Sequence, residues 1–191
     1  PTRSVFMNIG SRISLTGEGG LLALAFHPHF ASNGHFFVWY TAAGTGFSNR
    51  LSRFTVSATN WNQGNTNSEV VLFGQHDDCP NHNGGDLKFG ADGYLYVSLG
   101  DEGDSNDRCG TNSQNLAKHF FSGVLRLDVD QRPGSLRPNH HPSIIAPTNY
   151  AIPPDNPFIG FTQFNGLAVS PEAVRTEYWA LGLRNPFRMS F

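Results

Sequence analysis

The feature that most constrains the fold is a succession of short, strand-like runs separated by turn residues. The runs are rich in β-branched and aromatic residues and are bounded by Gly, Asn, Asp and Pro, which is typical of β-strands. They cover residues 21–26, 35–41, 50–56, 69–73, 86–89, 94–99, 124–129, 166–169, 178–181 and 187–191. Helical patterning is sparse, and residues 112–120 are the best candidate for a short turn of helix. The sequence therefore predicts an all-β chain.

Two stretches of the chain echo each other. A glycine pair at 19–20 opens the run LLALAF and leads through the turn 33–34 into HFFVWY. A second pair at 84–85 opens DLKF and leads through the turn 92–93 into YLYVSL, and residues 183–186 precede FRMSF as a third start. Repeated four-stranded units of this kind are typical of the blades of a β-propeller.

The repeats predict how the chain is divided. We expect blade one over residues 17–75, blade two over 81–181 with a Pro-rich insertion at 132–160, and the first strand of blade three at 183–191. Two blades cannot close a ring, so the chain is expected to be part of a larger propeller.

Charge and hydropathy exclude two classes of partner. Thirteen basic and fifteen acidic residues leave a net charge of −2, which argues against a nucleic-acid partner. The longest apolar run, Leu21–Phe26, is far too short for a membrane span. The start at Pro1 without a signal peptide suggests a mature or trimmed product. Cys79 and Cys109 are the only cysteines, and they either bridge or remain two free thiols.

Five runs, in order along the chain, carry a family resemblance: GEGGLLALAFHPHF (17–30), NHNGGDLKFGADGYLYVSLGD (81–101), VLRLDVD (124–130), YAIPPDNPF (150–158) and YWALGLRNPFRMSF (178–191). Together they resemble the soluble quinoprotein glucose and aldose sugar dehydrogenases, including the glucose/sorbosone dehydrogenase group. The resemblance implies a six-bladed β-propeller that holds pyrroloquinoline quinone (PQQ) near its axis with calcium. It also implies oxidation of the C1 hydroxyl of an aldose to the lactone, with hydride transfer to PQQ.

The same resemblance implies a periplasmic or secreted oxidoreductase with a small sugar as substrate and an external electron acceptor. The calcium ligands and the remaining PQQ contacts are expected beyond residue 191, so the chain alone is expected to be inactive. No G-x-G-x-x-G motif opens a helix after a strand, so nothing indicates a nicotinamide cofactor.

His82 and Asp101 are the candidate proton-transfer pair. A histidine near neutral pH can take a proton from a sugar hydroxyl, and by resemblance His82 is this general base. Asp101 ends the YLYVSLGD run, where its carboxylate can orient the imidazole and stabilise the imidazolium. The alternative for His82 is a residue that only caps a turn.

Arg184 and Asn185 are the candidate cofactor-binding pair. A permanently charged guanidinium suits negative charge on a quinone oxygen, which gives Arg184 a catalytic role as well, and the amide suits the cofactor's carbonyls. The alternative is an ordinary surface pair. Glu18 and Asn81 complete the expected substrate contacts with His82. Glu18 stands where many relatives carry a sugar-contacting Gln and Asn81 where some carry Asp, so glucose itself is not indicated as the substrate.

Other polar clusters are assigned no metal. Oxygen donors gather at Asp101, Glu102, Asp104, Asn106 and Asp107, but without EF-hand spacing we interpret Glu102, Asp104 and Asp107 as a solvated acidic loop rather than a local calcium site. The pair His140-His141 lacks spaced partner ligands and is interpreted as structural. The aromatic residues are interpreted as blade packing rather than sugar platforms, namely Phe36, Phe37, Trp39, Tyr94, Tyr96 and Trp179.

A second functional class keeps the fold and gives up the cofactor. Some propellers with these runs, which resemble the hedgehog-interacting proteins, are extracellular binding modules, and a lectin-like sugar binder is a further possibility. The co-occurrence of His82, Asp101, Arg184 and Asn185 favours the enzyme.

Overall fold

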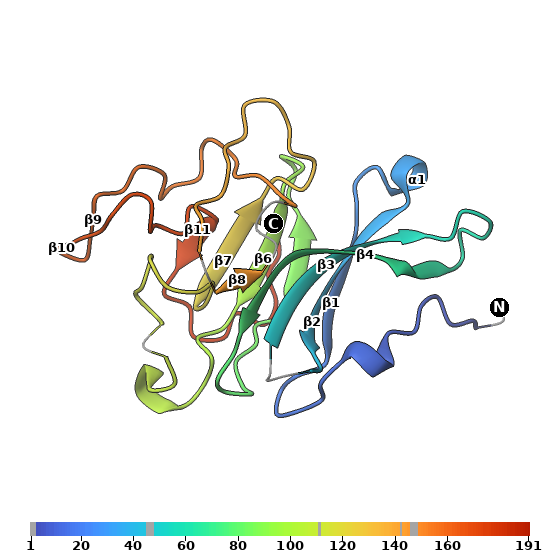
Figure 1. Ribbon diagram of the computed structural model, residues 1–191, viewed down its shortest axis with the longest axis horizontal. Coiled ribbons are helices and arrows are strands. Elements are labelled where there is room, and N and C mark those ends of the chain that lie inside the picture. The colour runs from blue at the N-terminus through green and yellow to red at the C-terminus, as the bar shows by residue number, and fades with distance from the viewer. Residues whose placement is uncertain (1–2, 45–47, 111, 142, 146–148) are drawn as a thin grey trace.

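The computed structural model describes residues 3–44, 48–110, 112–141, 143–145 and 149–191, and its architecture is two antiparallel β-sheets that face each other (Figure 1). The first sheet has the strand order β1-β2-β3-β4-β8, and the second has the order β11-β7-β6-β5. β9 and β10 form a separate two-stranded sheet, which projects at the left-hand side of Figure 1. The prediction of an all-β chain is confirmed. In the described ranges no helix is long and apolar enough to cross a membrane.

The strands range in length from the two residues of β8 to the 13 of β4, and the helices are single turns. The first sheet comprises β1 (Leu21–Phe26), β2 (His35–Ala42), β3 (Ser48–Val56), β4 (Gly64–His76) and β8 (Ile144–Ile145). The second sheet comprises β5 (Asp86–Phe89), β6 (Leu95–Leu99), β7 (Gly123–Leu127) and β11 (Tyr178–Leu181), and the two-stranded sheet comprises β9 (Gln163–Phe164) and β10 (Leu167–Ala168). The helical turns are η1 (Gly10–Arg12), α1 (Phe30–Asn33) and η2 (Ser105–Asp107).

Strand β2 is buried on both faces, which explains its continuous run of apolar residues. Phe37 and Trp39 point to one side and pack with the second sheet, whereas Phe36, Val38 and Tyr40 point to the other side. The N-terminal segment covers that other side with Phe6, Met7, Ile9 and Ile13.

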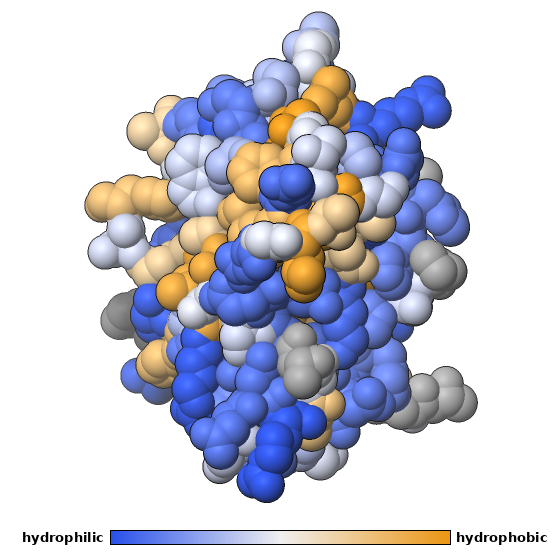
Figure 2. Space-filling view, turned by 90° about the vertical axis from the view of Figure 1, so that its left-hand side faces the viewer, coloured by the Kyte–Doolittle hydropathy of each residue, from blue (hydrophilic) through white to orange (hydrophobic). Residues whose placement is uncertain are grey.

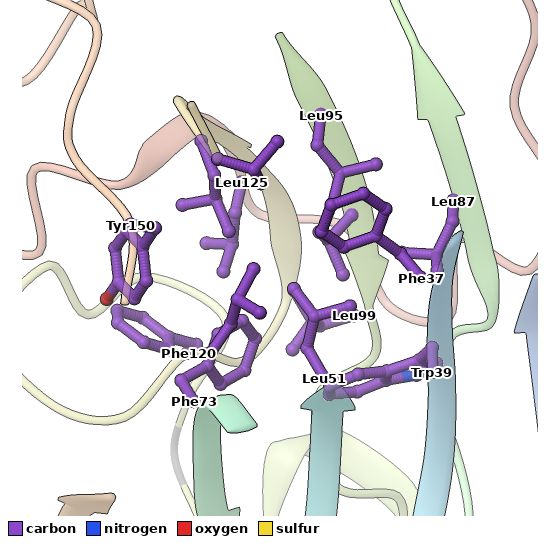
Figure 3. Close-up of a cluster of buried hydrophobic side chains, with 14 of the residues drawn as sticks. Phe37, Trp39, Leu51, Phe73, Leu87, Leu95, Leu99, Phe120, Leu125 and Tyr150 are labelled. Atoms are coloured by element: carbon purple, nitrogen blue, oxygen red, sulfur yellow. The ribbon is translucent and has the colours of Figure 1, made fainter. Parts of the chain in front are cut away.

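The main core lies between the two sheets (Figure 3). Phe37, Trp39, Leu51 and Phe73 of the first sheet meet Leu87, Leu95, Leu99 and Leu125 of the second, and Phe120 and Tyr150 close one end. Each of these side chains is at most 2% exposed. Burial of this much apolar surface between stacked sheets is how neighbouring propeller blades hold together. The interpretation of Phe36, Phe37 and Trp39 as packing residues fits this burial.

Two predicted elements are wrong. Residues 112–120 form turns and bends, not a helix, because side chains take the backbone groups that a helix would pair. Asn115 Oδ1 accepts the Ala117 N–H, and the Gln75 amide bonds both the N–H and the carbonyl of Phe120. Residues 187–191 form no strand, because Met189 donates its N–H to the Asp86 carboxylate rather than to a neighbouring strand.

The Pro-rich insertion 132–160 contributes to the first sheet. Its strand β8 pairs with the end of β4, with Gly74 opposite Ile145. Asn149 adds a hydrogen bond from its side chain to the Val71 carbonyl at 2.6 Å. The blade boundaries given above remain predictions.

Loops from distant parts of the chain meet at one end of the sheets. Glu18 donates its N–H to the Pro80 carbonyl, Ser122 donates to Gly100, and Asp101 donates to Arg184 at 2.9 Å. These backbone bonds bring together the loops 17–20, 77–85, 100–122 and 182–186, and this meeting point holds the candidate site.

Candidate functional site

The site is centred on a buried pair of His82 and Asp101. His82 Nδ1 lies 2.6 Å from Asp101 Oδ1, and the side chains are 11% and 4% exposed. The same carboxylate oxygen accepts the Gly103 N–H at 3.1 Å, which fixes its position. Because a carboxylate only accepts, the neutral ring carries its proton on Nδ1 and leaves the lone pair of Nε2 free. Among the described residues nothing hydrogen-bonds to Nε2, so it is the nitrogen available to a ligand.

The backbone at His82 is held in an unusual conformation. His82 has a φ of 53°, in the left-handed region that disfavours side chains with a Cβ. Its N–H donates to Glu18 Oε2 at 2.8 Å, and a Cβ at Gly100 would overlap its carbonyl oxygen. The glycine at 100 is therefore required by the close approach of the two loops, one carrying His82 and the other Asp101.

Glu18 and Asn185 form a frame around His82. Asn185 Nδ2 donates to Glu18 Oε2 at 3.4 Å, and Asn185 Oδ1 accepts the Gly84 N–H at 3.1 Å. Both side chains therefore contact the backbone on either side of the histidine. Their roles as substrate and cofactor contacts stay predictions, but the geometry adds a positioning role that the sequence did not suggest.

Arg184 brings a fixed positive charge to the same end of the molecule. Its backbone carbonyl accepts the Asp101 N–H at 2.9 Å, and its side chain is exposed. Within the described part of the chain no acceptor pairs with its guanidinium. Asn81, directly before His82, is also exposed. All six predicted site residues therefore lie in the same cluster of loops.

The acidic residues after β6 do not act as one group. Asp104 accepts the Ser105 N–H and pairs with Arg108, whereas Asp107 accepts the N–H groups of Asn112 and Ser113 at 2.9 Å. The interpretation of Glu102 as part of a solvated loop is wrong, because its side chain turns inward and the residue is only 3% exposed. Across the ranges described, no group of three or more His, Cys, Asp or Glu side chains could hold a metal ion.

Glu102 lies beside a second buried carboxyl group, Asp77, that sequence reasoning missed. Burial, together with the negative charge of Glu102, raises the pKa of Asp77 to about 8. No local motif marks this pair, because Asp77 and Glu102 are brought together only by the packing of two loops.

Cys79 and Cys109 form a disulfide, with Cα atoms 6.3 Å apart. It joins the loop that carries His82 to the loop that follows Asp101. The choice between a bridge and free thiols is settled in favour of the bridge.

A broad surface hollow of about 530 Å³ lies away from His82. Its lining comes from the Pro-rich insertion and includes Arg132, Arg137 and His140. The ring of His141 packs against His119, with centroids 5.4 Å apart, which fits the structural interpretation of the histidine pair.

Comparison with known proteins assigns the family. The Glucose / Sorbosone dehydrogenase family matches residues 6–151, which is most of the chain. The chain belongs to this family. The solved structure of the PQQ-bound form of aldose sugar dehydrogenase from Streptomyces coelicolor is 30% identical, with a TM-score of 0.51 over 69% of this chain and 36% of that one.

Two curated relatives have names without redox meaning. The HIPL2 protein of Arabidopsis thaliana is 30% identical over 97% of this chain, and the hedgehog-interacting protein of Mus musculus is 31% identical over 98% of it. The chain spans only 30% and 24% of their respective lengths.

The residues present fit a PQQ-type group. PQQ is a planar polyanion with quinone carbonyls, and the unpaired Arg184 guanidinium supplies a charge for such oxygens. One N–H of the Asn185 amide remains after its bond to Glu18. Either group would approach from the loop that is tied to Asp101.

Proposed function

We propose that this chain is part of a PQQ-dependent aldose sugar dehydrogenase that oxidises the C1 hydroxyl of an aldose to the lactone. The observation that carries the proposal is the His82–Asp101 pair with its free Nε2. The chain has two other His–carboxylate pairs among the described residues, and neither can serve. His27 uses both ring nitrogens, on Asp130 and on the neighbouring backbone, and His76 is half exposed beside an exposed Asp78.

The proposed chemistry assigns one role to each side chain. Nε2 of His82 accepts the proton of the sugar hydroxyl, and the Asp101 carboxylate on Nδ1 stabilises the imidazolium. Glu18 and Asn185 keep the imidazole in place by holding the backbone around His82. Arg184 attracts the anionic cofactor and its developing charge. When bound, PQQ supplies the two-electron acceptor for the C1 hydride.

The Cys79–Cys109 disulfide supports export to the periplasm or out of the cell, since disulfides persist in oxidising compartments. Calcium as a partner of PQQ, with ligands beyond residue 191, remains part of the proposal. So does an external electron acceptor.

The test is sugar-dependent dye reduction by the full-length protein reconstituted with PQQ and calcium. We expect His82→Asn to lower kcat by about 10²- to 10⁴-fold, the range attributed to a general base. The matched control is His76→Asn, which removes an exposed His–Asp pair and should leave kcat unchanged. Failure of the wild-type protein to bind PQQ would rule out the proposed function.

The second candidate is an extracellular binding propeller without redox chemistry. It is favoured by the 31% identity to the hedgehog-interacting protein over nearly the whole chain. A protein that retains its partner in a pull-down after His82→Asn, and that never reduces dye, belongs to this class.

A further inference from the structure

Two buried carboxyl groups without a counter-ion, Asp77 and Glu102, lie in the loops that carry His82 and Asp101. Asp77 is 1% exposed and Glu102 is 3% exposed. Neither forms an ion pair with any Lys, Arg or His side chain in the described ranges. The charges that act most strongly on Asp77 are those of Glu102 and Asp78, which are both negative. Two buried negative charges without a cation are costly, so the pair must either keep a proton or bind a cation.

Uncharged N–H donors orient these carboxylates but do not balance their negative charge. Asn49 Nδ2 donates to Asp77 at 2.6 Å, and the Cys79 N–H donates to its other oxygen at 3.1 Å. Asn112 Nδ2 donates to Glu102 at 2.6 Å, and the Asp78 N–H donates to its other oxygen at 3.0 Å. Four rigid contacts from three separate segments therefore hold the carboxylates close together, with no charge of opposite sign.

The two amide groups that donate to these carboxylates each have an oxygen without a hydrogen-bond partner. Asn49 Oδ1 and Asn112 Oδ1 are buried and accept no hydrogen bond, and each residue is only 2% exposed. Each oxygen belongs to the same amide group as the nitrogen that donates to one of the carboxylates. A buried oxygen without a partner costs roughly 1–3 kcal/mol, which makes two of them in one cluster a sign of a missing ligand.

We propose that Asp77, Glu102, Asn49 and Asn112 bind one calcium ion. The donor set is all oxygen, which selects a hard cation over zinc or copper. The two carboxylates neutralise the charge of a divalent ion, the amide oxygens gain the partner they lack, and water fills the remaining positions. Magnesium fits less well, because it demands a regular octahedron and gives up water reluctantly.

The ion would join three segments that support the candidate active site. Asn49 lies on β3, Asp77 follows β4, Glu102 lies within the loop closed by the disulfide, and Asn112 follows that loop. Asn112 Nδ2 also contacts the Asp101 carbonyl at 3.3 Å, so the ion would brace the loop that carries Asp101. The proposal does not depend on redox activity, and it concerns residues other than those expected beyond residue 191.

The experiment is calcium titration of the full-length protein by calorimetry, after chelation, with its disulfide intact and with neither PQQ nor sugar present. We expect at least one calcium per molecule and a higher Tm in calcium than in chelator. Asp77→Asn should weaken calcium binding by at least about tenfold, because one of two charged ligands is lost. The matched control is Asp104→Asn, which removes an exposed carboxylate of the same loop and should leave calcium affinity unchanged.

Three results would overturn the assignment. These are a wild-type chain that binds no calcium, an Asp77→Asn chain that binds it unchanged, and magnesium binding as tight as calcium binding. The first would mean that a proton shared between the carboxyl groups balances the pair. If Asp77→Asn fails to fold, the wild-type titration and Glu102→Gln still decide the matter. Dye reduction is measured separately, so failure of this site leaves the oxidoreductase proposal standing.

Discussion

At the scale of single residues, His82 owes its orientation to contacts at both its backbone and its ring. Glu18 accepts a hydrogen bond from its backbone N–H, while Asp101 Oδ1 accepts one from Nδ1, 2.6 Å away. A histidine at a φ of 53° without these contacts would relax to a more favourable conformation. The strain is therefore maintained by neighbours, as expected for a group that must meet a substrate in one geometry.

Asp101→Asn removes the charge of this side chain and keeps its size and shape, so it tests the charge alone. Asp101→Asn can still accept hydrogen bonds, but it has no charge to stabilise an imidazolium on His82. We expect kcat for dye reduction by the full-length enzyme to fall by about 10²-fold or more. The Tm should change little. Unchanged kcat with a folded variant would mean that the pair has no catalytic role.

At the scale of elements, the disulfide links two site loops that have little regular secondary structure between them. It closes a stretch of 30 residues that contains β5, β6 and η2. Between η2 and β7 the described chain is turns and bends, so few ladder hydrogen bonds hold this part of the loop. The covalent link limits how far the loops of His82 and Asp101 can separate in the unfolded chain.

We expect the double variant Cys79→Ser/Cys109→Ser to lose about 3.6 kcal/mol of free energy of unfolding, the amount that the loop-entropy relation gives for a sequence separation of 30. Urea denaturation of variant and wild type measures the difference. Wild type treated with a reductant serves as the control and should unfold at the same urea concentration as the variant. Equal midpoints for the variant and the oxidised wild type would contradict the expectation.

Strands that are marked by an apolar run between turn residues could be predicted from the sequence. Elements that depend on contacts with distant residues could not. β5 and β11 match their predicted bounds, because the apolar residues of each run end directly before a glycine, Gly90 and Gly182. Strand β8 is too short to leave a pattern. Residues 112–120 failed as a helix because Gln75, distant in the sequence, takes the backbone groups of Phe120.

The candidate site shows the same division. His82, Asp101, Arg184 and Asn185 could be named from short motifs, and the fold brings them together. The inward turn of Glu102 toward Asp77 depends on how two loops pack, so no local pattern could reveal it. The same is true of the contact between Glu18 and the backbone of His82.

At the scale of the whole molecule, apolar side chains are exposed on β11 of the second sheet and in the segments around it. Exposed apolar residues at this end of the chain are Leu167, Trp179, Leu183, Phe187 and Phe191. Figure 2, which looks onto the side of β9, β10 and β11, shows hydrophobic side chains gathered among polar ones. In a closed propeller the next blade would cover the outer side of this sheet.

The stability of the whole molecule also depends on a buried acid that the proposed chemistry does not use. Glu177, next to β11, accepts the Tyr150 hydroxyl at 2.8 Å and so ties the Pro-rich insertion to the second sheet. Burial raises the pKa of Glu177 to about 7, despite nearby hydrogen bonds and the charge of Arg175.

We expect this carboxyl to make stability fall as pH rises from about 4.5 to about 7. In that interval the folded chain keeps a proton that the unfolded chain has lost, so raising the pH favours unfolding, by up to about 3 kcal/mol. Glu177→Gln keeps an acceptor for Tyr150 and should make this decline in the free energy of unfolding, measured by urea denaturation at each pH, less steep. The remaining decline comes from Asp77, whose pKa is raised to about 8. Glu172→Gln, at a fully exposed glutamate, is the control and should leave the decline in place. A Glu177→Gln chain with the wild-type pH dependence would show that Glu177 is ionised inside the fold and balanced by Arg175, whose guanidinium is also buried.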